Sequence, residues 1–337
     1  MIRIVLIVFS IVIESCSHVA TNPLDQPTLK LSQSNQNQIY TGLKKDIIES
    51  QASHLKECNC MKAFYRDVFA KPDGSARYIF DEIVGNEAAK IAYGKDSVSV
   101  LAIGAGKLLN ELTAFAHILA RGINLHIYLN DWAYVFYGDK DFEKKALDLG
   151  EHPEKIPTGW REFYFWPWAK NHEKPYLPLF QEHHQAIEEF KTIIAKLDQM
   201  YHTKSTIEII KPAADWQVIL PKLDMIISID SFIDVPNLMW NLFYQFKLTN
   251  NPVRFISLNK TKPLGGFWES PDLSVRESNS MHEVSIDVYE ISSTDGNGSY
   301  TKLETRVFAP TPEQTKKAPE FKINPERDST QSPLDQK

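Results

Sequence analysis

Gly104, Ala105 and Gly106 are the residues whose types and spacing most clearly suggest chemistry. They connect an apolar, β-branched run at 97–103 to a helix-forming segment at 107–121. Glycine allows the backbone to approach a ligand where a Cβ atom would clash. The free N–H groups and the positive dipole end of the following helix favour an anionic group at such a turn. A strand, a glycine-rich turn and a helix in this order therefore predict a nucleotide-binding site in an α/β sheet.

Two phosphate-binding motifs can be compared with this segment. A P-loop ending at the turn would need glycine at position 101 and serine or threonine at position 108, and both positions hold leucine. The dinucleotide fingerprint fits at Gly104 and Gly106, but Leu109 stands where its third glycine should be. The P-loop is therefore excluded, and a dinucleotide site stays open as a weaker alternative.

Acidic residues follow three further predicted strands. Asp131 comes after a strand at 123–129, Asp215 after a strand at 206–211 and Asp230 after a strand at 223–229. The C-terminal ends of parallel strands meet at one edge of a sheet, and ligands bind beyond that edge. A carboxylate there can accept hydrogen bonds from two vicinal hydroxyl groups. Each aspartate could instead cap a helix, because Asp is favoured at the N-cap, and this alternative stays open.

The order of these motifs resembles the class I S-adenosylmethionine-dependent methyltransferases over about residues 78–308. The resemblance implies that Gly104–Gly106 passes under the methionine and ribose part of the cofactor. It implies that Asp131 accepts hydrogen bonds from the ribose hydroxyls. It also implies that Asp215 binds the adenine amino group beside Trp216, and that Asp230 lies near the transferred methyl group. S-adenosylmethionine is therefore the expected cofactor.

Two residues of the first motif depart from that family. Ala102 stands where the family has an acid near the amino group of the cofactor, and Leu108 replaces a glycine-like position. Methyl transfer could need only alignment of a nucleophile with the sulfonium carbon, so no catalytic base is named. The expected activity is methyl transfer to an unknown small molecule or protein. The alternative is a non-catalytic binding or structural module with the same fold.

The elements that position these residues alternate along the chain. Helices at 107–121, 180–201 and 235–246 are expected between strands. The strands are expected at 97–103, 123–129, 206–211, 223–229, 253–258, 284–291 and 300–308, the last two forming a hairpin. This pattern predicts an α/β fold. Its core is a mostly parallel, Rossmann-like sheet of about seven strands, with helices on both faces and a C-terminal antiparallel hairpin.

The remaining segments complete the expected organisation. Residues 39–93 form an N-terminal helical segment, 94–310 the Rossmann-like domain, and 311–337 a disordered tail. Residues 132–178 form an aromatic insertion whose role as packing, substrate lid or membrane-interface patch stays open. His183 and His184 are expected on a solvated helix face.

The N-terminus has the pattern of an export signal. One positive charge at Arg3, about ten apolar residues and a small residue match the tripartite secretory signal. The apolar run is shorter than the roughly 20 residues that span a bilayer. The sequence at 13–16 resembles a bacterial lipobox, which implies that Cys16 is lipidated, becomes the new N-terminus and anchors the chain to a membrane, with residues 1–16 forming the signal peptide and lipobox. Residues 17–38 are expected to be a flexible tether; without a signal, the chain would be cytoplasmic.

The composition limits the possible partners. The chain has 337 residues, 43% of them hydrophobic, which is enough for a sizeable core. Its net charge of −6 argues against a nucleic-acid binder, which would usually be basic. His54, Cys58 and Cys60 lie on one segment without a fourth ligand, so no metal site is expected.

Overall fold

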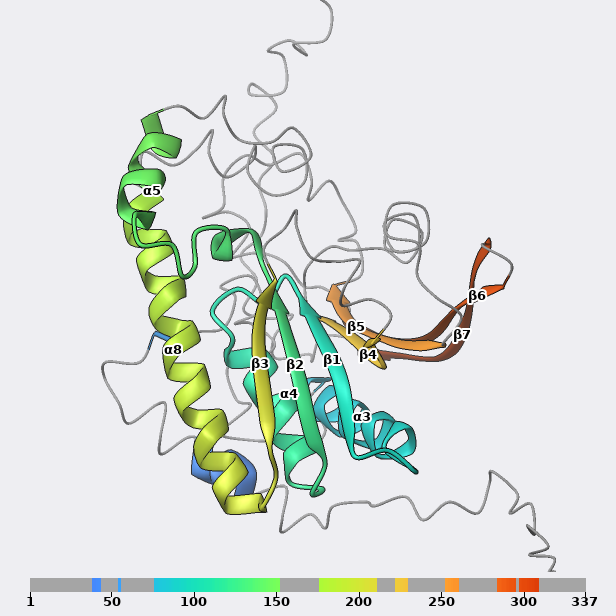
Figure 1. Ribbon diagram of the computed structural model, residues 1–337. Coiled ribbons are helices and arrows are strands. Elements are labelled where there is room, and N and C mark those ends of the chain that lie inside the picture. The colour runs from blue at the N-terminus through green and yellow to red at the C-terminus, as the bar shows by residue number, and fades with distance from the viewer. Residues whose placement is uncertain are drawn as a thin grey trace, which may run out of the picture.

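The computed structural model contains a seven-stranded sheet (Figure 1). The structure describes residues 38–43, 54–55, 76–151, 176–210, 222–229, 252–260, 284–294 and 297–308. The strand order is β3-β2-β1-β4-β5-β6-β7. The strands are β1 (Ser97–Ile103), β2 (Asn124–Asn130), β3 (Ser205–Ile210), β4 (Met225–Ile229), β5 (Val253–Lys260), β6 (Val284–Thr294) and β7 (Asn297–Phe308).

The direction of the strands confirms the predicted sheet. β1 pairs in parallel with both β2 and β4, and β3 and β5 extend the parallel part outward. β6 runs antiparallel to β5, and β7 runs antiparallel to β6 as the C-terminal hairpin. The order reverses between β1 and β4, and at such a switch point ligands bind outside the C-terminal ends of the strands.

Both faces of the central strands are buried. Val98, Val100 and Ala102 of β1 share one core with the helices, while Leu101, on the opposite face, is also fully buried. Strands covered on both faces are apolar at consecutive positions rather than alternating, as residues 100–103 are, although Ser97 and Ser99 stand at the start of the strand. This explains why the continuous apolar run correctly predicted β1.

Three long helices form one layer against the sheet. They are α3 (Ala76–Ile91), α4 (Leu109–Leu119) and α8 (Tyr176–Tyr201), and α4 contacts both of the others (Figure 1). Every residue of α4 is buried, including its two titratable residues, Glu111 and His117. A short 3-10 helix, η3 (Trp132–Tyr134), and α5 (Phe142–Glu151) follow β2 and pack on α8. The helix predicted at 235–246 lies outside the described residues.

A charged network is buried between α3 and α4. Arg77 and Asp81 of α3 are 1% and 0% exposed, and their side chains form an ion pair of 3.1 Å. Arg77 also donates a hydrogen bond to the Thr113 hydroxyl of α4. The Tyr40 hydroxyl donates to Asp81 over 2.8 Å, so residues 38–43 are joined to the same layer. The network therefore connects three segments that are distant in the sequence.

Residues 54–55 contact the layer at α8. The His54 backbone N–H donates to both carboxylate oxygens of Glu189, at 3.0 and 2.9 Å, and Leu55 is buried. Within the ranges that the structure describes, no helix is long and apolar enough to span a membrane.

Candidate functional site

The turn after β1 has an unusual backbone. Gly104, Gly106 and Leu108 all have positive φ angles, of 66°, 51° and 67°. Glycine adopts this left-handed region readily, which explains the glycines at 104 and 106. For Leu108 the same conformation costs roughly 1–2 kcal/mol. Its side chain is 1% exposed, so burial of the leucine offsets the strain at the position that is glycine-like in the methyltransferase family.

The backbone N–H groups of the turn are directed at the end of β2. Gly104 and Ala105 both donate to the carbonyl oxygen of Asn130, at 2.8 and 3.2 Å. Gly106 donates to Asp131 Oδ2 at 2.9 Å. A phosphate-binding turn instead directs its N–H groups at the ligand. The geometry therefore argues against the dinucleotide alternative that the sequence left open.

Asp131 is the acid at the centre of this arrangement. Its Oδ1 accepts a hydrogen bond of 2.9 Å from the Ala133 N–H, so the side chain also caps η3. The residue is 6% exposed, and this burial raises the pKa of its carboxyl group. The cap that the sequence left open as an alternative for Asp131 is thus formed. Each carboxylate oxygen keeps a second acceptor position, so ribose binding remains compatible with the geometry.

Tyr134 holds the same turn from its other side. Its hydroxyl donates to the Gly106 carbonyl oxygen over 2.6 Å, and the residue is fully buried. Burial raises the pKa of the phenol well above its ordinary value, so the hydroxyl keeps its proton and remains a donor. Sequence reasoning missed this contact because a tyrosine inside an aromatic-rich segment has no distinguishing pattern.

The helix α8 supports the site, which corrects one expectation. His183 is not solvated: it is 7% exposed, and its ring lies 6.4 Å from that of Tyr134. His184 is half-buried against Phe142. The expectation was wrong because η3 and α5 cover the polar face of α8, and the pattern of one helix cannot show which neighbour covers it. Lys107 of the turn forms an ion pair with Glu182 of α8.

Glu111 is a second buried acid that sequence reasoning missed. It lies in the first turn of α4 and is 3% exposed. Burial raises the pKa of its carboxyl group to about 8, and nearby Arg77 opposes this shift while Asp131 adds to it. An acid in the first helical turn is common, because it interacts favourably with the helix dipole. The sequence therefore offered no sign that this one is buried.

The structure brings together one part of the predicted site. Gly104, Ala105 and Gly106 meet Asp131 at the switch point of the sheet. Asn130 Nδ2 donates to the Ile210 carbonyl over 3.0 Å and so connects the ends of β2 and β3. The other predicted residues, Cys16, Asp215, Trp216 and Asp230, lie outside the described residues. In the described ranges no three His, Cys, Asp or Glu side chains are grouped as metal ligands.

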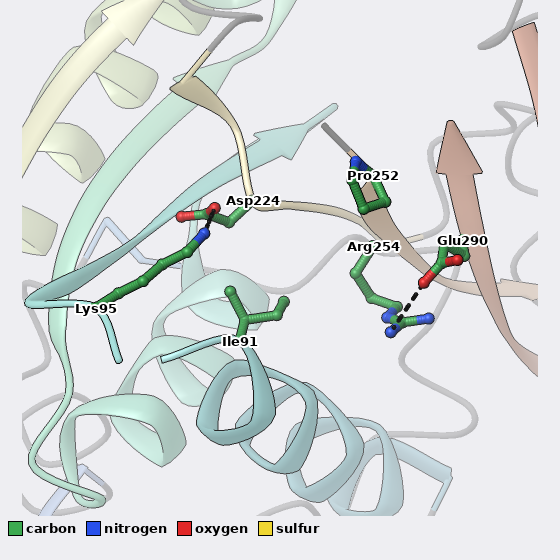
Figure 2. Close-up of a pocket in the computed structure, with 6 residues that line it drawn as sticks. All are labelled: Ile91, Lys95, Asp224, Pro252, Arg254 and Glu290. Atoms are coloured by element: carbon green, nitrogen blue, oxygen red, sulfur yellow. Dashed lines mark hydrogen bonds and ion pairs between the residues drawn. The ribbon is translucent and has the colours of Figure 1, made fainter. Parts of the chain in front are cut away.

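A small pocket lies at the opposite, N-terminal edge of the parallel strands (Figure 2). It has a volume of about 190 Å³. Lys95 pairs with Asp224 at 2.5 Å, and Arg254 pairs with Glu290 at 3.4 Å and with Glu87 at 2.9 Å. Asp224 also accepts a hydrogen bond from the Ser99 N–H. These ion pairs hold the starts of the strands together, on the edge away from the glycine turn.

Comparison with known proteins gives little further information. No protein-family model matches the sequence, and no curated protein matches it. Among solved structures, an uncharacterized ACR superfamily protein from Burkholderia thailandensis has 8% identity and a TM-score of 0.22, with 84% of this chain and 51% of that chain covered. An inferred methyl transferase of the same superfamily and organism, bound to S-adenosyl-homocysteine, has 9% identity and a TM-score of 0.22, with 84% and 53% covered. The chain thus spans about half the length of the solved chains it matches.

Proposed function

We propose that this chain binds S-adenosylmethionine at the turn after β1 and acts as a methyltransferase-like protein. The observation that carries the proposal is the arrangement of the turn at the switch point of the sheet. Gly104, Ala105 and Gly106 turn their N–H groups toward Asn130 and Asp131. A ligand at this edge therefore meets the Asp131 carboxyl group, whose two oxygens each keep one acceptor position. Ribose hydroxyls and a sulfonium cation suit such surroundings, whereas a phosphate does not.

The space beside the turn is compatible with this ligand. A Cβ atom built on Gly106 would meet no atom within 4 Å, so the glycine borders open space. When bound, S-adenosylmethionine would supply an activated methyl group, and the protein would align it with the acceptor. In the proposed site, Gly104–Gly106 and Asp131 would hold the methionine and ribose part of the cofactor. Asp215 and Trp216 would hold the adenine, and Asp230 would belong to the part of the site that binds the methyl group.

Replacing Gly106 by alanine tests this placement of the cofactor. Its φ of 51° disfavours alanine, so we expect a loss of stability of roughly 1–2 kcal/mol. The added methyl group also enters the open space, so affinity for S-adenosylmethionine should fall at least about tenfold, which corresponds to roughly 1.4 kcal/mol. The affinity can be measured by isothermal titration calorimetry on the full-length chain.

Gly122→Ala is the matched control. Gly122 also has a positive φ, of 74°, and also borders open space, but it follows the far end of α4. We expect the same loss of stability and unchanged affinity. Equal affinities of the two variants would contradict the placement of the cofactor at Gly106.

The alternative function is a non-catalytic binding module, and one observation favours it. Both oxygens of Asp131 already accept backbone N–H groups, which is what a purely structural aspartate would do.

A protein anchored outside the cytoplasm through Cys16 would also lack access to the cofactor, so localisation separates the two functions. In this alternative, the anchoring is a proposal that rests on the lipobox pattern alone. Radioactive palmitate should label the wild-type chain in bacterial cells and not the Cys16→Ser variant; equal labelling would contradict it.

A further inference from the structure

The peptide groups of Gly106 are held from both sides by one short corner of the chain. Asp131 Oδ2 accepts the Gly106 N–H at 2.9 Å, and the Tyr134 hydroxyl donates to the Gly106 carbonyl at 2.6 Å. Both side chains belong to the four residues that follow β2. A glycine has no side chain to restrict its backbone, so it samples many conformations unless its neighbours select one. These two hydrogen bonds restrict the Gly106 backbone to one conformation.

Tyr134 is itself rigidly supported. It is 0% exposed, and its ring packs edge-on against His183 of α8. The ion pair between Lys107 and Glu182 ties the next residue of the turn to the same helix. A residue that orients a site must be fixed by its own packing, and Tyr134 meets this condition.

We infer that Tyr134 is a positioning residue of the site, which holds Gly106 in the conformation that the ligand meets. This inference rests on the proposed function. Tyr134 acts through the Gly106 carbonyl and needs no contact with the ligand. Without its hydroxyl, the turn would populate other conformations. The ligand would then bind only the competent fraction of molecules, which weakens the apparent affinity.

The first test compares Tyr134→Phe with a matched control in the full-length chain. Tyr134→Phe removes one oxygen and keeps the ring on His183. Affinity for S-adenosylmethionine should fall roughly 3- to 10-fold, as expected for the loss of one hydrogen bond. Tyr137→Phe also removes a buttressing hydroxyl, one that bonds to Glu188 and Lys191 of α8. Because these partners do not touch the turn, affinity should stay within about twofold of wild type.

The second test needs no ligand. In protein labelled with ¹⁵N-glycine, Tyr134→Phe should shift the Gly106 amide resonance and speed its hydrogen exchange, while Gly122 and Gly138 stay unchanged. A loss of stability alone would not single out Gly106. Asp131→Asn combined with Tyr134→Phe should weaken binding by a factor different from the product of the two single effects, because both residues restrict the backbone of the same glycine.

The outcomes separate this inference from the proposed function. If the wild type and Tyr134→Phe bind S-adenosylmethionine equally, the positioning role is overturned and the proposed function stands. If the wild type binds none, the proposed function fails. An unchanged Gly106 resonance in Tyr134→Phe would overturn the positioning role for any ligand at this turn.

Discussion

Replacing Arg77 by methionine should lower the free energy of unfolding by about 3–5 kcal/mol at neutral pH. Asp81 is 0% exposed, and its ion pair with Arg77 has no solvent to replace it. Methionine keeps much of the apolar volume of arginine but leaves the carboxylate buried without its cation. Asp81 keeps its neutral partners, the hydroxyls of Tyr40 and Thr113, but loses the cation. Urea unfolding followed by circular dichroism measures the loss.

The double variant Arg77→Met/Asp81→Asn is the control for this prediction. Asparagine has nearly the same shape as aspartate and can still accept from the Tyr40 hydroxyl, but it carries no charge. We expect it to recover more than half of the loss, because an uncompensated buried charge accounts for most of it. A single variant within about 1 kcal/mol of wild type, or a double variant as unstable as the single one, would contradict the account.

Replacing Glu111 by glutamine should stabilise the protein increasingly as the pH rises from about 5 to 8. The pKa of Glu111 is raised from 4.5 to about 8 in the folded protein. Between these values the folded state binds one proton more than the unfolded state. The unfolding free energy of the wild type therefore falls with pH, by up to about 1.4 kcal/mol per pH unit from this group. Glutamine does not ionise, so the variant lacks this loss.

Urea unfolding at pH 4, 6 and 8 measures the unfolding free energy of the wild type and of Glu111→Gln. His117→Phe, on the same helix, is the control. Burial lowers the pKa of His117 from 6.5 to about 3. Below about pH 6.5 the unfolded state binds a proton at His117 that the folded state does not, so the unfolding free energy of the wild type decreases as the pH falls. Phenylalanine does not titrate, so the His117→Phe variant should become more stable relative to wild type as the pH falls. A stability difference between Glu111→Gln and wild type that does not change with pH would refute the buried, protonated state of Glu111.

The strands were predictable because their physical cause is local. The apolar run at 97–103 matches β1 (Ser97–Ile103), and the predicted hairpin matches β6 and β7, although both strands extend further. Strands covered on both faces carry this signal in consecutive residues. The order of the strands has no such local cause. It depends on which edges meet in three dimensions, and only the structure shows β1 between β2 and β4.

The candidate site was predictable only in part. Gly104, Gly106 and Asp131 were identified because turn glycines and acids at strand ends are recognisable in one sequence. Their contacts were not, because Asp131 reaches Gly106 across 25 positions and Tyr134 reaches it across 28. The burial of Glu111 also depends on distant neighbours. The pattern of a single helix predicts that its polar residues are exposed to solvent, because it does not show which other element covers them.

Calorimetric titration of the full-length chain with S-adenosylmethionine tests the central claim most directly. We expect binding in the micromolar range, and S-adenosylhomocysteine should compete for the same site. Because the N–H groups of the turn point to Asn130 and Asp131, NAD and ATP should give no binding heat. Absence of both heat and thermal stabilisation at millimolar S-adenosylmethionine, or tighter binding of a phosphate-bearing nucleotide, would contradict the account and leave a Rossmann-like domain with another ligand.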